Sequence, residues 1–266
     1  MAASFAEKYI ELLRQYYYVG GMPEAVEAFV TRHDLNEVRT IQQNIITAYG
    51  ADMSKHTSKT ETVRISQVFQ SLPSQLAKEN RKFIYGVAKP GARAADFEMA
   101  IQWLIDAGIV YRISRVNKVS SPLKYYEDIS AFKLFLLDVG LLGCMASLPP
   151  TIILDNPLPL SEYRGMMAEQ YVAQQLSSAE IPLFYWSNTT SPAEIDFLHQ
   201  GERHVCAIEV KASTNVRGKS ISMLVKENAG TVAGIRFSLL PFRRQETLTN
   251  YPLYAVPFVA PSLSNL

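Results

Sequence analysis

Two strand-like segments near the C-terminus limit the fold of this sequence more than any other feature. Residues 193–200 (AEIDFLHQ) and 205–213 (VCAIEVKAS) are separated by a short polar turn, which is the pattern of a β-hairpin. Because side chains alternate along a strand, Glu209 and Lys211 share one face, and the valine between them points to the other. The chain is therefore expected to build an apolar sheet that carries a polar strip.

The polar strip contains residue types that suit metal-dependent hydrolysis. The hairpin places Asp196 on the strand beside Glu209, and Glu169 lies on a predicted helix at 164–179 that would supply a third carboxylate. Carboxylate oxygens are the ligands that Mg²⁺ and Mn²⁺ prefer, and a lysine beside the metal can orient or deprotonate water. The candidate catalytic residues are Glu169, Asp196, Glu209 and Lys211, with the three carboxylates as metal ligands.

The first third of the chain is predicted to be helical. Apolar residues recur at helical spacing from residue 4 to residue 49, with breaks at Gly20-Gly21 and near Asp34. Two further helices, at 60–79 and 96–108, precede a segment that alternates like a strand. This order predicts a winged helix-turn-helix.

A winged helix suggests two kinds of partner. Four basic residues near the predicted wing could contact DNA phosphates, and they are Arg112, Arg115, Lys118 and Lys124. Docking of a partner protein is the alternative, and the sequence leaves both open.

A proline-rich connector at 148–160 divides the chain into two predicted domains, 1–147 and 161–266. The first would be helical and winged-helix-like, and the second would be a sheet flanked by helices, with closing strands in the segment that includes Tyr251 to Val259. The predicted fold class is therefore α/β, or α+β overall.

Composition limits the partners and the compartment. Lys and Arg total 26 against 25 acidic residues, so nucleic-acid binding would need a local basic patch. Cys144 and Cys206 are the only cysteines, which predicts a reducing cytoplasm and buried thiols rather than a disulfide framework. No apolar run reaches the roughly 18 residues of a membrane span, so no membrane partner is expected.

Glu169, the segment EIDFL at 194–198 and the segment IEVKA at 208–212 resemble the PD-(D/E)XK nuclease superfamily. Across nearly the whole chain, segments such as YYYVGGMPEAV at 16–26 and FKLFLLDVGLL at 132–142 resemble the C-terminal region of a bacterial and archaeal AAA+ ATPase family. That region is a domain of unknown function. The sequence has no G-x-x-x-x-G-K-[ST], so no ATP hydrolysis is expected, and the ATPase would be a missing or separate partner.

The resemblance implies Mg²⁺- or Mn²⁺-dependent cleavage or processing of nucleic acid, with DNA as the favoured substrate. In that mechanism Asp196 and Glu209 hold the metal, Glu169 assists, and Lys211 positions the attacking water. The alternative is a non-catalytic module that retains the nuclease-like fold and binds DNA or a protein. The sequence shows no dense basic and aromatic track that would mark a nucleic-acid groove.

Overall fold

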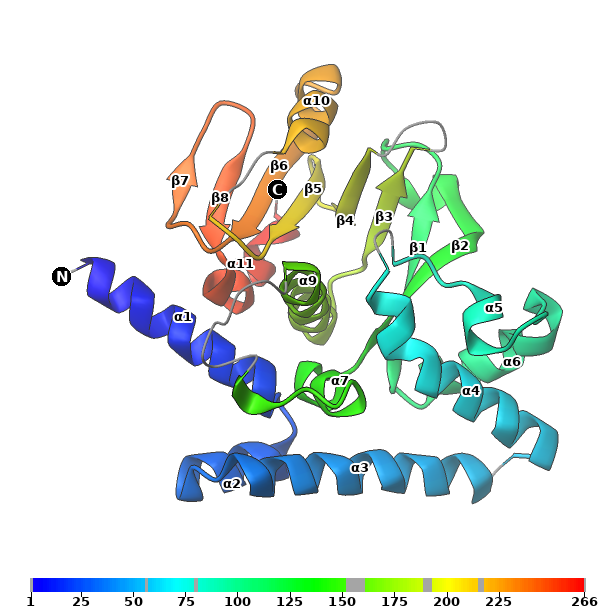
Figure 1. The fold of residues 1–266 in the computed structure, drawn as a ribbon. Helices are drawn as coiled ribbons and strands as arrows, with labels where there is room; N and C mark the ends of the chain where they lie inside the picture. The colour runs from blue at the N-terminus through cyan, green and yellow to red at the C-terminus, as the bar shows by residue number, and fades with distance from the viewer. Residues whose placement is uncertain are drawn as a thin grey trace. The chain divides into compact units, whose positions relative to one another are not determined.

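The computed structural model describes residues 2–55, 57–78, 81–151, 161–188, 193–214 and 218–265. These residues form two compact units, each assembled from segments that are not contiguous in the sequence (Figure 1). We call them the sheet unit (1–10, 113–133 and 163–266) and the helical unit (11–112 and 134–162). The predicted connector, 148–160, lies largely outside the described residues.

The helices of the helical unit within residues 2–55, 59–76 and 94–106 lie where the sequence predicted them, whereas the short helices at 85–88 and 139–145 were not predicted. α1 (Ala2–Val19) enters it, and it continues with α2 (Pro23–Arg32), α3 (Leu35–Lys55), α4 (Lys59–Leu76), α5 (Tyr85–Ala88), α6 (Ala94–Asp106) and α7 (Val139–Met145). Pro23 begins α2, and a Ser58–Glu61 capping box begins α4. The apolar stripe of α6 predicted its buried face, because Phe97, Ile101 and Leu104 are all buried.

The sheet unit contains an eight-stranded mixed sheet, which confirms the predicted fold class. Its strands lie in the order β2 (Glu127–Leu136), β1 (Val110–Val116), β3 (Phe184–Ser187), β4 (Glu194–Gln200), β5 (Val205–Lys211), β6 (Val232–Ser238), β8 (Thr249–Pro252) and β7 (Arg243–Arg244). The predicted hairpin is β4–β5, antiparallel with Phe197 opposite Ile208. The segment 113–133 belongs to this unit because β1 pairs in parallel with β3.

Helices lie on both faces of the sheet. α10 (Lys219–Glu227) packs Ile221, Leu224 and Val225 into an apolar cluster that includes Ala207 of β5. Cys206, the residue before Ala207 on β5, points to the opposite face of the sheet. There its thiol contacts the carbonyl of Leu263 in α11 (Val256–Leu263). α9 (Ser161–Ser178) carries the buried Glu169. The polar residues of the hairpin are therefore held in a well-packed core.

One predicted element is wrong. The sequence suggested closing strands from Tyr251 to Val259, but β8 ends at Pro252 and α11 begins at Val256. Aromatic and β-branched residues favour strands, whereas Pro257 is well placed in the first turn of a helix. The buried residues of α11 recur at helical spacing; they are Val256, Val259, Ala260 and Leu263. Both cysteines are buried, as predicted. Among the described residues, no helix has the length and apolar character that crossing a membrane requires.

Candidate functional site

A buried ion-pair cluster occupies part of the predicted catalytic site. Lys133 of β2 is fully buried, and its Nζ lies 3.1 Å from Glu169 Oε1 and 2.5 Å from Glu194 Oε1. Its ammonium also lies over the ring of Tyr185, 4.8 Å from the centroid. Burial alone would lower the pKa of Lys133, but Glu169 and Glu194 raise it, so the net direction is upward and the amine stays charged.

Asp196 lies beside this cluster and is half-buried. Its Oδ2 accepts a hydrogen bond from the backbone amide of Val210 at 2.7 Å, which ties β4 to β5. Burial and the nearby Glu169 carboxylate raise the pKa of Asp196 to about 7, although Lys133 acts in the opposite direction. Glu169 and Asp196 are therefore close enough to repel each other when both are ionised.

We expect Asp196→Asn to stabilise the protein at about pH 8 and to have a smaller effect at about pH 5. The folded-state pKa of about 7 exceeds the unfolded value of about 4, so the folded state binds more protons between these values. Wild-type stability therefore falls as pH rises through that window. Asparagine stays neutral and can still accept from Val210, so it removes this loss. Urea unfolding at both pH values measures the difference.

The exposed Glu202 offers a matched control, because Glu202→Gln removes a carboxylate from the β4–β5 turn without changing a buried group. Its effect should be the same at both pH values. An equal effect of Asp196→Asn at both pH values would contradict the raised pKa of Asp196.

Glu209 has different partners from Glu169. Its Oε2 accepts from Nε of Arg236 on β6 at 2.7 Å, and its Oε1 lies 3.4 Å from Nζ of Lys211. Glu209 and Arg236 are register neighbours on parallel strands, and both are buried, whereas Lys211 is partly exposed. The predicted Glu209–Lys211 pair is thus present, but as part of a triad with Arg236.

The arrangement does not fit a divalent cation. The ammonium of Lys133 contacts the carboxylates of Glu169 and Glu194, and Glu209 is paired with Arg236 and Lys211. Within the described parts of the chain, no group of three or more His, Cys, Asp or Glu side chains is placed to hold a metal. Of the predicted ligands, Glu169 and Glu209 are partners of internal cations, and Asp196 accepts a hydrogen bond from the backbone amide of Val210.

The basic residues of the predicted wing also have internal partners. Arg115 pairs with Asp128 at 2.6 Å, and Lys124 pairs with Glu127. Lys118 lies 5.5 Å from the ring centroid of Tyr126, and Arg112 interacts within the chain as well. These contacts reduce what the wing can offer to DNA phosphates.

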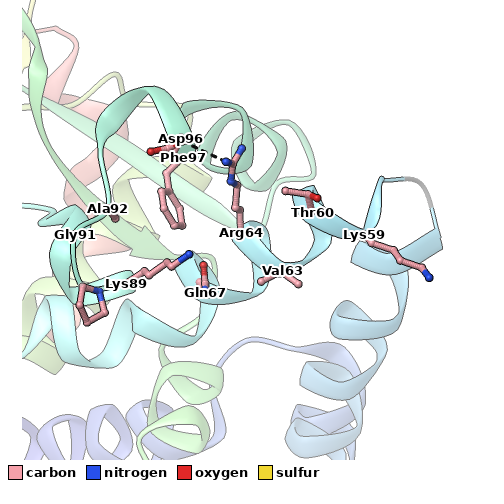
Figure 2. Close-up of a pocket in the computed structure, with 11 residues that line it drawn as sticks. Lys59, Thr60, Val63, Arg64, Gln67, Lys89, Gly91, Ala92, Asp96 and Phe97 are labelled. Carbon is pink, nitrogen blue, oxygen red and sulfur yellow. Dashed lines mark hydrogen bonds and ion pairs between the residues drawn. The ribbon is translucent and has the colours of Figure 1, made fainter.

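A cavity of about 490 Å³ lies in the helical unit between α4 and the α5–α6 turn (Figure 2). Its lining combines apolar side chains with basic ones; the residues are Lys59, Thr60, Val63, Arg64, Gln67, Lys89, Pro90, Gly91, Ala92, Asp96 and Phe97. Asp96, its one acidic lining residue, lies 3.2 Å from Arg64, as the dashed line in Figure 2 shows. Lys59 and Lys89 are exposed and carry the remaining positive charge.

Sequence reasoning missed Lys133, Arg236 and the role of Glu194. A single lysine within the apolar strand AFKLFLL was the available signal for Lys133, because a buried lysine requires partners. Glu194 lies on the same strand as Asp196 and pairs with that lysine. Arg236 gave no comparable signal, since its partner depends on the parallel pairing of β5 with β6.

These observations define a mixed α/β protein that joins a helical unit to a sheet with an internally neutralised polar core. Residues 10–151 match a family described as a domain of unknown function (DUF8612), and residues 164–255 match a second domain of unknown function (DUF4143). The first match covers more than half of the chain, so the protein belongs to the DUF8612 family. The DUF4143 domain is typically associated with AAA-type ATPase-like proteins. No curated protein and no solved structure matches the chain.

Proposed function

We propose that the protein is a non-catalytic binding module whose helical unit docks an acidic segment of a partner protein. The observation that carries this proposal is the basic and apolar cavity between α4 and the α5–α6 turn. Val63, which is 54% exposed, offers apolar contact, and the exposed Lys59 and Lys89 are the basic residues of the lining beside Arg64. A segment with an apolar anchor and flanking carboxylates is complementary to this lining.

The non-catalytic part of the proposal rests on Lys133. Metal-dependent hydrolysis needs carboxylates that are free to bind a cation, and Glu169 and Glu194 are paired with a buried ammonium. Moving Lys133 out would leave charges unpaired in the core, which is costly. The nuclease-like motif is thus proposed to serve the sheet as an ion-pair core.

A protein partner is favoured over DNA by the charge of α6. In a winged helix this element would enter the major groove, where it would face a dense array of phosphates. Between Ala94 and Asp106, α6 has no Lys or Arg and carries three acidic residues, Asp96, Glu98 and Asp106. Such a helix would be repelled by the duplex. The association of the second domain with AAA-type ATPases makes an ATPase the proposed partner.

Charge reversal at the cavity tests the proposal. We expect a labelled peptide of alternating Glu and Leu to bind wild type, and Lys59→Glu with Lys89→Glu to weaken it by about tenfold, equivalent to about 1.4 kcal/mol. Lys226→Glu, an exposed change in the sheet unit, is the matched control and should leave affinity unchanged. Fluorescence anisotropy against the peptide and against a duplex DNA measures both affinities.

Three outcomes would overturn the proposal. Equal peptide affinity in the double variant and the control would remove the cavity from the interface. Duplex binding that weakens steeply with salt and is lost in the double variant would make DNA the partner. Plasmid nicking with Mg²⁺ or Mn²⁺ that disappears in Asp196→Asn would restore the nuclease function.

A further inference from the structure

A second cavity, of about 400 Å³, lies in the sheet unit beside α10 and β6. Its lining includes two arginines and no carboxylate; the residues are Gly218, Ser222, Arg236, Leu240, Pro241, Phe242, Arg243, Gln245, Leu248 and Asn250. Glu209, which is not part of the lining, offsets the charge of Arg236, so the excess positive charge of the lining comes from Arg243 and suits an anionic ligand. This cavity belongs to a different unit from the proposed docking cavity, so the two can be tested separately.

Arg236 is the buried cation of this cavity, with only 5% of its surface exposed. Its Nε donates to Glu209, and its two terminal nitrogens have no hydrogen-bond partner among the described residues. A guanidinium has five N–H donors, so Arg236 keeps donors beyond its pair with Glu209. An anion in the cavity would satisfy them in the fork geometry that arginine offers to phosphate.

The N-terminus of α10 lies at the same place. Gly218 is its N-cap and provides no side-chain cap, and the first turn of this nine-residue helix contains no acidic residue. The orphan amides and the helix dipole favour an anion there. A Cβ on Gly218 would collide with the Arg236 guanidinium and with Glu209, so glycine keeps the arginine and the helix N-terminus close together.

The remaining lining suggests what the anion is attached to. Arg243 is an exposed second cation, and Phe242, 60% exposed, has its ring 5.3 Å from that of Tyr251. An exposed aromatic ring at the edge of a cavity provides a surface on which a nucleobase can stack. A cavity of this size suits a ligand of the size of a mononucleotide.

We propose that this cavity binds a nucleoside phosphate, with the phosphate monoester between Arg236 and the α10 N-terminus and the base against Phe242. Arg243 provides further charge for the phosphate. The phosphate can belong to a free nucleotide or to the 5′ end of a nucleic-acid chain, and the site chemistry is the same for both.

Calorimetric titration of adenosine 5′-monophosphate and of inorganic phosphate into the full chain tests this assignment. We expect Arg243→Gln to weaken nucleotide binding by about tenfold. Arg244→Gln, the adjacent exposed arginine that does not line the cavity, should leave it unchanged. Phe242→Ala should remove the advantage of the nucleotide over inorganic phosphate but keep phosphate binding, and Gly218→Ala should abolish both without unfolding the protein.

The assignment is overturned if folded wild type binds neither ligand at millimolar concentration, or if Arg243→Gln and Arg244→Gln behave alike. A 5′-phosphorylated trinucleotide and its 5′-hydroxyl form distinguish the two sources. Tighter binding of the phosphorylated trinucleotide than of the mononucleotide would support a nucleic-acid end, and the reverse order would support a free nucleotide. Binding of the 5′-hydroxyl form as tightly as the phosphorylated one would contradict a phosphate site.

Discussion

Replacing Lys133 with methionine is expected to lower the free energy of unfolding by about 3–5 kcal/mol. The side chain is fully buried, and its ammonium pairs with both Glu169 and Glu194, at 3.1 and 2.5 Å. Methionine fills a similar volume, so the loss would come from leaving the buried Glu169 and the partly buried Glu194 without a cation rather than from a cavity. Urea unfolding monitored by circular dichroism measures the change.

Lys124→Met is the matched control, because Lys124 is 74% exposed and pairs with Glu127 at the surface. Exposed pairs contribute about 0–1 kcal/mol, so this variant should be nearly neutral. Adding Glu169→Gln and Glu194→Gln to Lys133→Met should recover most of the lost stability, since neutral side chains need no counter-charge. A Lys133→Met protein as stable as Lys124→Met would show that the cluster is not a structural core.

Local patterns in the sequence predicted the elements that carry the site. The alternation in 193–200 and 205–213 predicted β4 and β5, because each segment presents one face to the core. Helical spacing at 96–108 predicted α6, which ends at Asp106 just before Gly108. The partial likeness to a domain associated with ATPases came from short motifs, and the family matches support that coarser relationship.

Long-range pairing could not be read from these patterns. Alternation shows which residues of one strand share a face, but it does not show that Lys133, 36 residues before Glu169, reaches the same cluster. Likewise, the Glu209–Arg236 pair exists because β5 and β6 are parallel neighbours. The Glu209–Lys211 pair was therefore predictable from one strand, whereas the cations Lys133 and Arg236 were not. The nuclease-like activity of the motif stays a prediction.

The two motifs that support the ATPase-family resemblance meet in the helical unit, where they have a structural role. Asp138, from FKLFLLDVGLL, accepts hydrogen bonds from the amides of Gly21 at 2.7 Å and Leu141 at 2.9 Å. Gln42 of α3 is fully buried and donates to the carbonyls of Tyr18 and Val19. These hydrogen bonds hold the end of α1, the middle of α3 and the start of α7 together.

Gly140 lies where these three helices come closest, and Gly140→Ala is expected to destabilise the protein by about 3 kcal/mol. A Cβ there would lie 2.7 Å from Gln42 Nε2, from the amide nitrogen of Gly20 and from the carbonyl carbon of Val19. Two of these three atoms are backbone and cannot rotate away, so the helices would have to separate and weaken the Gln42 hydrogen bonds. Thermal and urea unfolding measure the loss.

The same substitution in α3 offers an internal comparison, because a Cβ on Gly50 would meet no atom within 4 Å. Alanine has the higher helix propensity, so Gly50→Ala should stabilise the protein by about 1 kcal/mol. Opposite signs for one chemical change in two helices of the same unit would show that the glycine in the DVGLL segment is required by close packing. If Gly140→Ala were neutral or stabilising, the packing around Gly140 would have to be looser than these contacts indicate. The glycine of the DVGLL segment would then not be required for folding.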